Sequence, residues 1–133
     1  MSRSNIEIVF ADWLDAMRRG DVDAMERVLA PDVVHSGVIA DWVCDGREAV
    51  LDVARNRSRE LPAVEALELV AAGDHVVMTV RGPELGPEPD DAERHRGQAC
   101  VVFTLRDGLI VRMQDYVRRA DALEAAGAQV SWL

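Results

Sequence analysis

The first twenty residues carry apolar side chains at helical spacing, behind a capping box formed by Ser4 and Glu7. Gly20 should end this helix, because glycine readily adopts the left-handed conformation found at helix C-caps. The spacing therefore predicts one amphipathic helix with a single buried face. The residues expected on that face are Ile6, Val9, Phe10, Trp13, Leu14 and Met17.

Two further helices are predicted next. Asp21 can cap the first of them, which Pro31 should stop because proline cannot continue a helix. A second capping box, Asp45 to Glu48, should open the other, which we expect to end near Glu60, ahead of a proline. A strand over residues 32–38 and an irregular stretch over 39–44 should lie between them.

The remaining chain alternates between β-branched residues and turn signals. The pattern predicts four consecutive strands, over 63–71, 75–81, 98–106 and 109–117. Helices first and strands afterwards are typical of the α+β class. We therefore expect residues 1–133 to form one domain, a cone in which three N-terminal helices pack on a strongly curved, mostly antiparallel sheet and enclose a pocket.

One carboxylate lies on an otherwise apolar strand face. Strand alternation puts five residues on this face: Leu109, Val111, Met113, Asp115 and Val117. A two-residue turn at Asp107-Gly108 would place Cys100 opposite Asp115 and Val102 opposite Met113. The predicted inner wall of the cone thus carries Cys100, Val102, Met113 and Val117 around Asp115. A carboxyl group in such surroundings can act as a general acid or base, or it can pair with an arginine.

Further polar and aromatic candidates complete the predicted site. His35 lies in the middle of a strand and can move protons near neutral pH, although a structural role is the alternative. Arg81 ends a strand and is expected either to orient a ligand or to be an exposed charge. Trp13 and Trp42 are expected as pocket wall, with Trp13 also fitting the helix core.

Composition and sequence pattern disfavour several classes of function. The net charge of −9 disfavours nucleic acid and anionic membranes as partners. The three histidines and two cysteines lack metal-ligand spacing, so we predict neither a metal nor a cofactor. The N-terminus lacks the long apolar run of a signal peptide, and no apolar stretch approaches the length of a membrane span. We expect a cytoplasmic protein that binds a small hydrophobic molecule.

Several local motifs together resemble the nuclear transport factor 2-like superfamily, in its SnoaL-like, polyketide cyclase-like branch. The motifs are Trp13 with Gly20-Asp21, Leu29 to Val34 (LAPDVV), Asp45 to Val50 (DGREAV), Arg106 to Arg112 (RDGLIVR) and Asp115-Tyr116. The resemblance implies the cone fold, a hydrophobic cavity and homodimers packed through the sheet. It covers nearly the whole chain, and it implies no single activity, since members include isomerases, cyclases, hydrolases and binding proteins.

The catalytic sets of the enzymes in this superfamily match incompletely. The three functional positions of ketosteroid isomerases correspond to Gly37, Trp13 and Cys100, none of which keeps the expected group. In limonene-epoxide-hydrolase relatives, Asp115-Tyr116 and Arg81 match, whereas Pro83 replaces the second acid. SnoaL-like cyclases, which close rings by an aldol step, often carry an acid after the last strand, where this chain has Val117, Arg118 and Arg119.

Three hypotheses for function follow. The first is an acid/base enzyme acting on a small hydrophobic carbonyl or epoxide compound, with Asp115 as the acid/base and His35 as its partner. The second is a non-catalytic binding module with the same pocket. The third is a dimerisation domain whose cone is filled by side chains.

Overall fold

The computed structural model describes residues 4–39, 41–59, 64–82 and 97–128. Six strands form one sheet in the order β2-β1-β6-β5-β4-β3, antiparallel except for the parallel pair β1–β6. The strands are β1 (Leu29–Ser36), β2 (Val43–Asp45), β3 (Ala66–Ala72), β4 (His75–Arg81), β5 (Gln98–Arg106) and β6 (Leu109–Tyr116). The helices are α1 (Asn5–Glu7), the π-helical η1 (Ile8–Leu14), α2 (Asp15–Arg19), α3 (Val22–Arg27), α4 (Arg47–Arg59) and α5 (Arg119–Ala125).

Local signals placed three helix caps correctly, but the predicted stop at Pro31 is wrong, because α3 already ends at Arg27. The Ser4 hydroxyl accepts a hydrogen bond from the Glu7 N–H at 3.2 Å, as the predicted capping box requires. Gly20 ends the first rod, α1-η1-α2, in the left-handed conformation with φ of 70°. The Asp21 carboxylate caps α3 by accepting from the Ala24 N–H at 3.1 Å.

The buried face of the first rod differs from the predicted one. Phe10 is 53% exposed, whereas Ile8, which was not predicted, is 4% exposed. The middle of the rod is π-helical, and the Asp15 N–H bonds to the Phe10 carbonyl five residues back. The α-helical period of 3.6 residues therefore predicts the wrong buried residues across this π-helical segment.

The region around β1 also differs from the prediction. The strand begins at Leu29, three residues earlier than expected, and includes Pro31. Proline is tolerated there because the pairing of β1 with β6 is irregular between Leu29 and Val34, where no regular backbone hydrogen bond is required of it. The stretch predicted to be irregular contains β2, which pairs with the end of β1.

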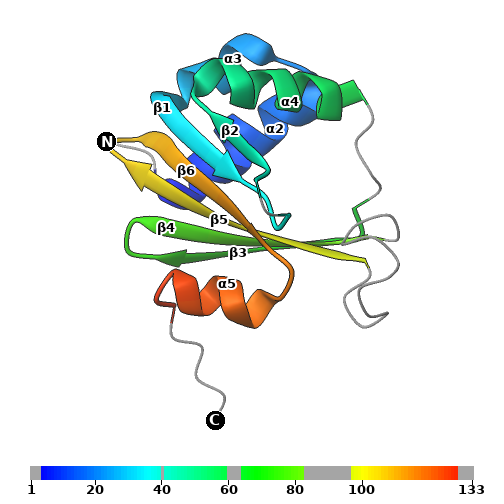
Figure 1. Cartoon of the computed structure of the whole chain (residues 1–133), viewed down its shortest axis with the longest axis vertical. Helices are drawn as coiled ribbons and strands as arrows, with labels where there is room; N and C mark the ends of the chain where they lie inside the picture. The colour runs from blue at the N-terminus through cyan, green and yellow to red at the C-terminus, as the bar shows by residue number, and fades with distance from the viewer. Residues whose placement is uncertain (1–3, 40, 60–63, 83–96, 129–133) are drawn as a thin grey trace.

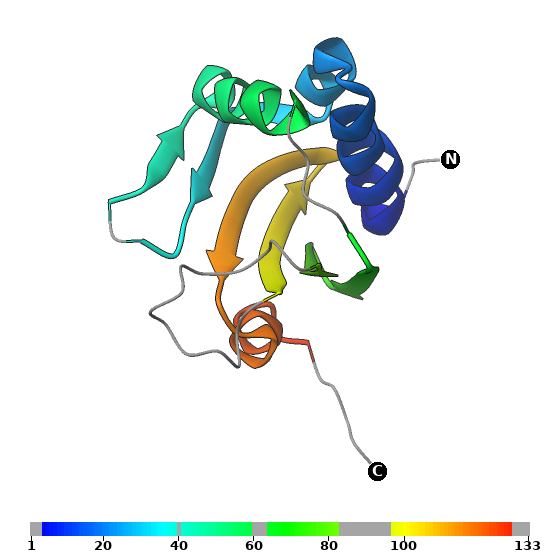
Figure 2. The ribbon, with the colours of Figure 1, turned by 90° about the vertical axis from the view of Figure 1, so that its right-hand side faces the viewer.

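Helices lie on both faces of the sheet (Figures 1 and 2), and each face buries an apolar cluster. On the inner face, α1 to α4 cover an apolar cluster whose strand members include Val33, Phe103, Ile110 and Met113. On the outer face, α5 packs on β4, β5 and β6 over a smaller cluster. The sheet members of that smaller cluster are Val77, Cys100 and Val102, and Ala122, Leu123 and Ala126 come from α5.

The predicted α+β fold is confirmed. Figure 2 shows the sheet curving beneath the N-terminal helices without closing on itself. Irregular pairing occurs where β1 meets β6 and where β6 meets β5. Such bulges bend a strand and increase its twist, so they account for part of the curvature. Within the described residues, no helix is both long and apolar enough to cross a membrane.

Candidate functional site

A β-bulge in β6 changes the predicted register of the last hairpin. The turn at Asp107-Gly108 pairs Arg106 with Leu109 and Leu105 with Ile110, as expected of a two-residue turn. The next pair is Thr104 with Arg112, so Val111 is the extra residue of a bulge. Beyond the bulge, every residue of β6 faces a partner one position away from the predicted one.

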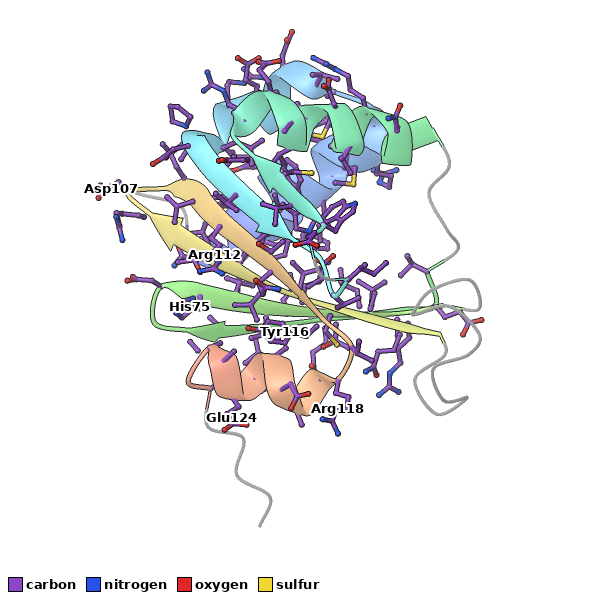
Figure 3. All side chains as sticks on the ribbon, in the orientation of Figure 1. His75, Asp107, Arg112, Tyr116, Arg118 and Glu124 are labelled. Carbon is purple, nitrogen blue, oxygen red and sulfur yellow. The ribbon has the colours of Figure 1, made fainter. Side chains whose placement is uncertain are left out.

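The shifted register corrects the predicted inner wall. Asp115 lies opposite Val101 and Met113 opposite Phe103, whereas Cys100 lies opposite Tyr116. Cys100 and Val102 belong to the outer cluster beneath α5, so their predicted position on the face of Asp115 is wrong. Because paired residues share a face, Val101 and Phe103 take the inner positions. Figure 3 labels Tyr116 on β6, and this side chain packs with the outer cluster.

The structure joins Asp115 directly to His35. Parallel pairing of β1 with β6 places His35 beside Met113. Met113 precedes Asp115 by two residues, so both side chains lie on the same face of β6. The His35 Nε2 and Asp115 Oδ1 atoms lie 2.8 Å apart. The His35 side chain is 8% exposed and that of Asp115 is 23% exposed. The two predicted catalytic residues therefore form one hydrogen-bonded pair, in which the carboxylate is the more accessible partner.

Trp42 borders this pair. Its ring lies 5.0 Å from the His35 ring between centroids, with the two planes at 87°. Such an edge-to-face arrangement is a favoured geometry for aromatic rings. Trp42 is half-buried, so part of the indole remains at the surface beside the pair. The role of Trp42 as pocket wall stays a prediction.

The remaining predicted site residues lie elsewhere or deeper. Trp13 and Met113 are 3% and 2% exposed and belong to the apolar core of the inner face. Val117 directly follows β6 and is half-buried. Arg81 is exposed and alternates with Val77 and Thr79, the outer-face residues of β4. It therefore does not face Asp115, and the arginine–carboxylate pair considered from the sequence does not form there.

Cys100 has the environment of a structural thiol. It is 1% exposed, and its Sγ lies 3.9 Å from the Thr79 hydroxyl oxygen. Burial raises the pKa of the Cys100 thiol, with the Thr79 hydrogen bond opposing the shift. A buried thiol with a raised pKa is a poor nucleophile.

The surface groove that the structure shows lies away from the pair of His35 and Asp115. This groove of about 500 Å³ lies at the opposite end of β1 from His35, and its lining residues are Asp23, Glu26, Arg27, Leu29, Pro31, Arg47 and Leu109. In the part of the chain that the structure describes, no group of three or more His, Cys, Asp or Glu residues could hold a metal ion. Pro83, which replaces the second acid of the epoxide hydrolase set, lies outside the described residues.

The curved sheet under N-terminal helices recurs in solved structures. A "putative polyketide cyclase" from Sinorhizobium meliloti is 21% identical over 81% of this chain and 93% of that chain, with a TM-score of 0.61. Another protein of the same description, from Silicibacter sp. TM1040, is 25% identical over 99% of both chains, with a TM-score of 0.58. A de novo designed protein with a curved β-sheet is 21% identical over 96% of this chain and 98% of that chain, with a TM-score of 0.65.

The class defined by this fold is the nuclear transport factor 2-like superfamily. Residues 10–113 match the model of the SnoaL-like domain, and the chain belongs to that family. The family resemblance inferred from the sequence is thus confirmed. No match was found among curated proteins.

Proposed function

We propose that this protein is an acid/base catalyst that moves a proton at the carbon next to the carbonyl group of a small hydrophobic compound. The observation that carries the proposal is the 2.8 Å contact between His35 Nε2 and Asp115 Oδ1 on the inner face of the sheet. A carboxylate and an imidazole in hydrogen-bonding contact are typical partners for proton transfer. They are also the two groups that the sequence nominated independently.

The unequal accessibility of the two side chains supports different roles for them. Asp115, at 23% exposed, is the group that can reach a ligand, whereas His35, at 8%, is nearly enclosed. Asp115 would remove a proton from the carbon next to the carbonyl, leaving an enolate. The same carboxyl group would return the proton to that enolate or to a neighbouring atom. His35 would hold the carboxyl group in place through the 2.8 Å contact.

The family comparison supports this reaction class. Aldol ring closure in polyketide cyclases and double-bond shifts in isomerases both begin with an enolate. Two relatives of similar fold are described as "putative polyketide cyclase". Epoxide opening receives less support, because Arg81 is on the outer face. For the ligand wall we propose Val101, which pairs with Asp115, and Val117, two residues after it, whereas the ring contact of Trp42 is with His35.

The test is hydrogen–deuterium exchange at the carbon atoms beside the carbonyl of 2-tetralone, an apolar bicyclic ketone, followed by NMR in D₂O. The wild-type protein should accelerate the exchange over buffer, and Asp115→Asn should lower the accelerated rate by about 100-fold or more. Asp121→Asn, on the exposed surface of α5, is a matched control that should leave it unchanged. An equal rate in wild type and Asp115→Asn would refute the proposal.

A non-catalytic binding module is the second candidate. It is favoured by the absence of a side chain at Gly37 and by the outer-face positions of Cys100 and Arg81, which remove groups that related enzymes use. The same experiment separates the two functions. A binding module would show chemical-shift changes at Val101 and Trp42 on adding 2-tetralone, with no exchange above that in buffer.

We further propose a cytoplasmic homodimer that associates through the outer face of β1 and β6. Val34 and Gln114 are half-buried on this face, and α5, which packs on β4, β5 and β6, covers it at most along β6. Arg112, labelled in Figure 3, is exposed there. Sedimentation velocity should show a dimer that Arg112→Glu weakens, and a wild-type monomer at high micromolar concentration would refute the assembly.

A further inference from the structure

The turn between β1 and β2 has an unusual backbone. The Gly37 N–H donates to the Trp42 carbonyl at 2.9 Å, and the Trp42 N–H donates to the Ile39 carbonyl at 3.1 Å. Asp41, directly before Trp42, has a φ of 71°, in the left-handed region that residues other than glycine rarely adopt. Strained backbone of this kind persists where surrounding contacts hold it, and it is common near functional sites.

Gly37 leaves the space that Trp42 occupies. A Cβ atom built on Gly37 would lie 2.6 Å from Cε3 of Trp42 and 3.1 Å from its Cδ2. The first distance is shorter than any real contact, so a side chain at this position would displace the indole. Gly37 lies two residues after His35, on the same side of the strand by alternation. The missing side chain thus lets the indole fold back toward the histidine.

The indole lies where it can restrain the imidazole. A histidine ring has a broad, roughly twofold torsional preference about its last side-chain bond, so its own backbone does not fix the ring. The hydrogen bond to Asp115 holds one edge of the ring. The Trp42 ring, at 5.0 Å and 87°, packs against it from another direction. Rotation of the imidazole away from Asp115 would lose this packing.

We propose that Trp42 is a positioning residue, which holds the His35 ring in the orientation that presents Nε2 to Asp115, and that Gly37 is required for it. This inference rests on the proposed function, because it assigns Trp42 a role in the same proton transfer. Trp42 acts through His35 and need not touch the reacting atoms. Asp41 contributes through its left-handed backbone conformation, which orients the chain so that the Trp42 side chain lies over Gly37.

The first measurement does not depend on activity. Long-range ¹H–¹⁵N NMR spectra report which nitrogen of His35 carries a proton. With Asp115 as a carboxylate acceptor, the wild-type ring should occupy one state in which Nε2 is protonated. Trp42→Ala and Gly37→Ala should each give ring nitrogen shifts averaged between the two tautomers. Trp42→Phe should restore most of the single state, because a smaller ring still packs edge to face.

The second measurement uses the 2-tetralone exchange reaction. In Trp42→Ala, kcat should fall at least about tenfold while KM changes much less, because misplaced catalytic groups weaken the transition state more than the bound state. Trp42→Phe should recover most of kcat. Val43→Ala removes an exposed residue of the same hairpin and should match wild type in both measurements.

The two measurements separate the failure of this inference from the failure of the proposed function. A single protonated-Nε2 state in both Trp42→Ala and Gly37→Ala would overturn the positioning role, whatever the exchange rates. Loss of that state in a protein that never catalyses exchange would keep the positioning role and refute the acid/base function. If Trp42→Ala fails to fold, Gly37→Ala and Trp42→Phe still test the same prediction.

Discussion

Each face of the sheet holds a polar pair with at least one buried member, and these two pairs differ in accessibility. On the outer face, Cys100 and Thr79 are 1% and 4% exposed beneath α5. On the inner face, His35 is 6% exposed as a whole residue, but its partner Asp115 is half-buried. The Cys100 thiol and the Thr79 hydroxyl contact each other in a closed core. In the pair of His35 and Asp115, the Asp115 carboxylate remains accessible to solvent. Accessibility, rather than burial of polar groups, therefore distinguishes the candidate site from the core.

The largest effect is expected in the inner core. The chain has two phenylalanines, Phe103 at 1% exposed on the inner face and Phe10 at 53% exposed on the first helical rod. Phe103→Ala should lower the free energy of unfolding by about 3–5 kcal/mol, because it leaves a cavity in a packed core. Phe10→Ala, the matched control, should change it by less than about 0.5 kcal/mol. Urea denaturation measures both, and equal effects would contradict the assigned core.

The coverage of the outer face by α5 can be tested through the reactivity of the Cys100 thiol. In a Cys44→Ser variant, which leaves Cys100 as the single thiol, iodoacetamide at pH 8 should label the native protein at least about 100-fold more slowly than the urea-unfolded protein. Two causes act together, because α5 blocks access and burial raises the pKa of Cys100, which lowers the thiolate fraction at this pH. Rapid native labelling, measured by mass spectrometry, would mean that α5 does not cover this face.

The inner pair should show energetic coupling. A double-mutant cycle with His35→Ala, Asp115→Ala and the double variant should give an interaction energy of about 1–2 kcal/mol in urea denaturation. The physical reason is that removal of one partner leaves a largely buried polar group without its hydrogen bond. The exposed pair Arg118 and Asp121, at 3.0 Å, serves as a control with coupling below about 0.5 kcal/mol. Additive effects in the inner pair would contradict the contact.

The smallest effect concerns the attachment of α5. Arg119 donates two hydrogen bonds to the Glu68 carboxylate on β3, at 2.8 and 3.1 Å, and this contact raises the pKa of Arg119. Arg119→Ala should lower the free energy of unfolding by about 0.5–1 kcal/mol at low salt, and by less in 1 M NaCl because salt screens exposed charges. An effect that is independent of salt would point to lost packing of the arginine stem instead.

Much of the fold could be predicted because its signals are local. Ser4, Asp21 and Gly20 act on backbone groups within four residues, so their effects do not depend on the rest of the chain. Alternation along β6 was enough to put Asp115 with core residues. The bulge at Val111 left that conclusion intact but moved the partners of Asp115 by one position. A one-residue shift in pairing exchanges the two faces of the neighbouring strand, which is why Cys100 and Val102 were placed on the wrong side.

The sequence by itself determined the α+β class, the caps at Ser4, Gly20 and Asp21, the family resemblance and the candidacy of His35 and Asp115. The tertiary structure decided that these two residues meet. Their contact depends on parallel pairing between β1 and β6, strands that lie far apart in the chain and whose register no local pattern specifies. The tertiary structure likewise decided that the Trp42 side chain lies over Gly37 and packs against His35. Long-range pairing and packing brought together residues that local signals could only nominate one at a time.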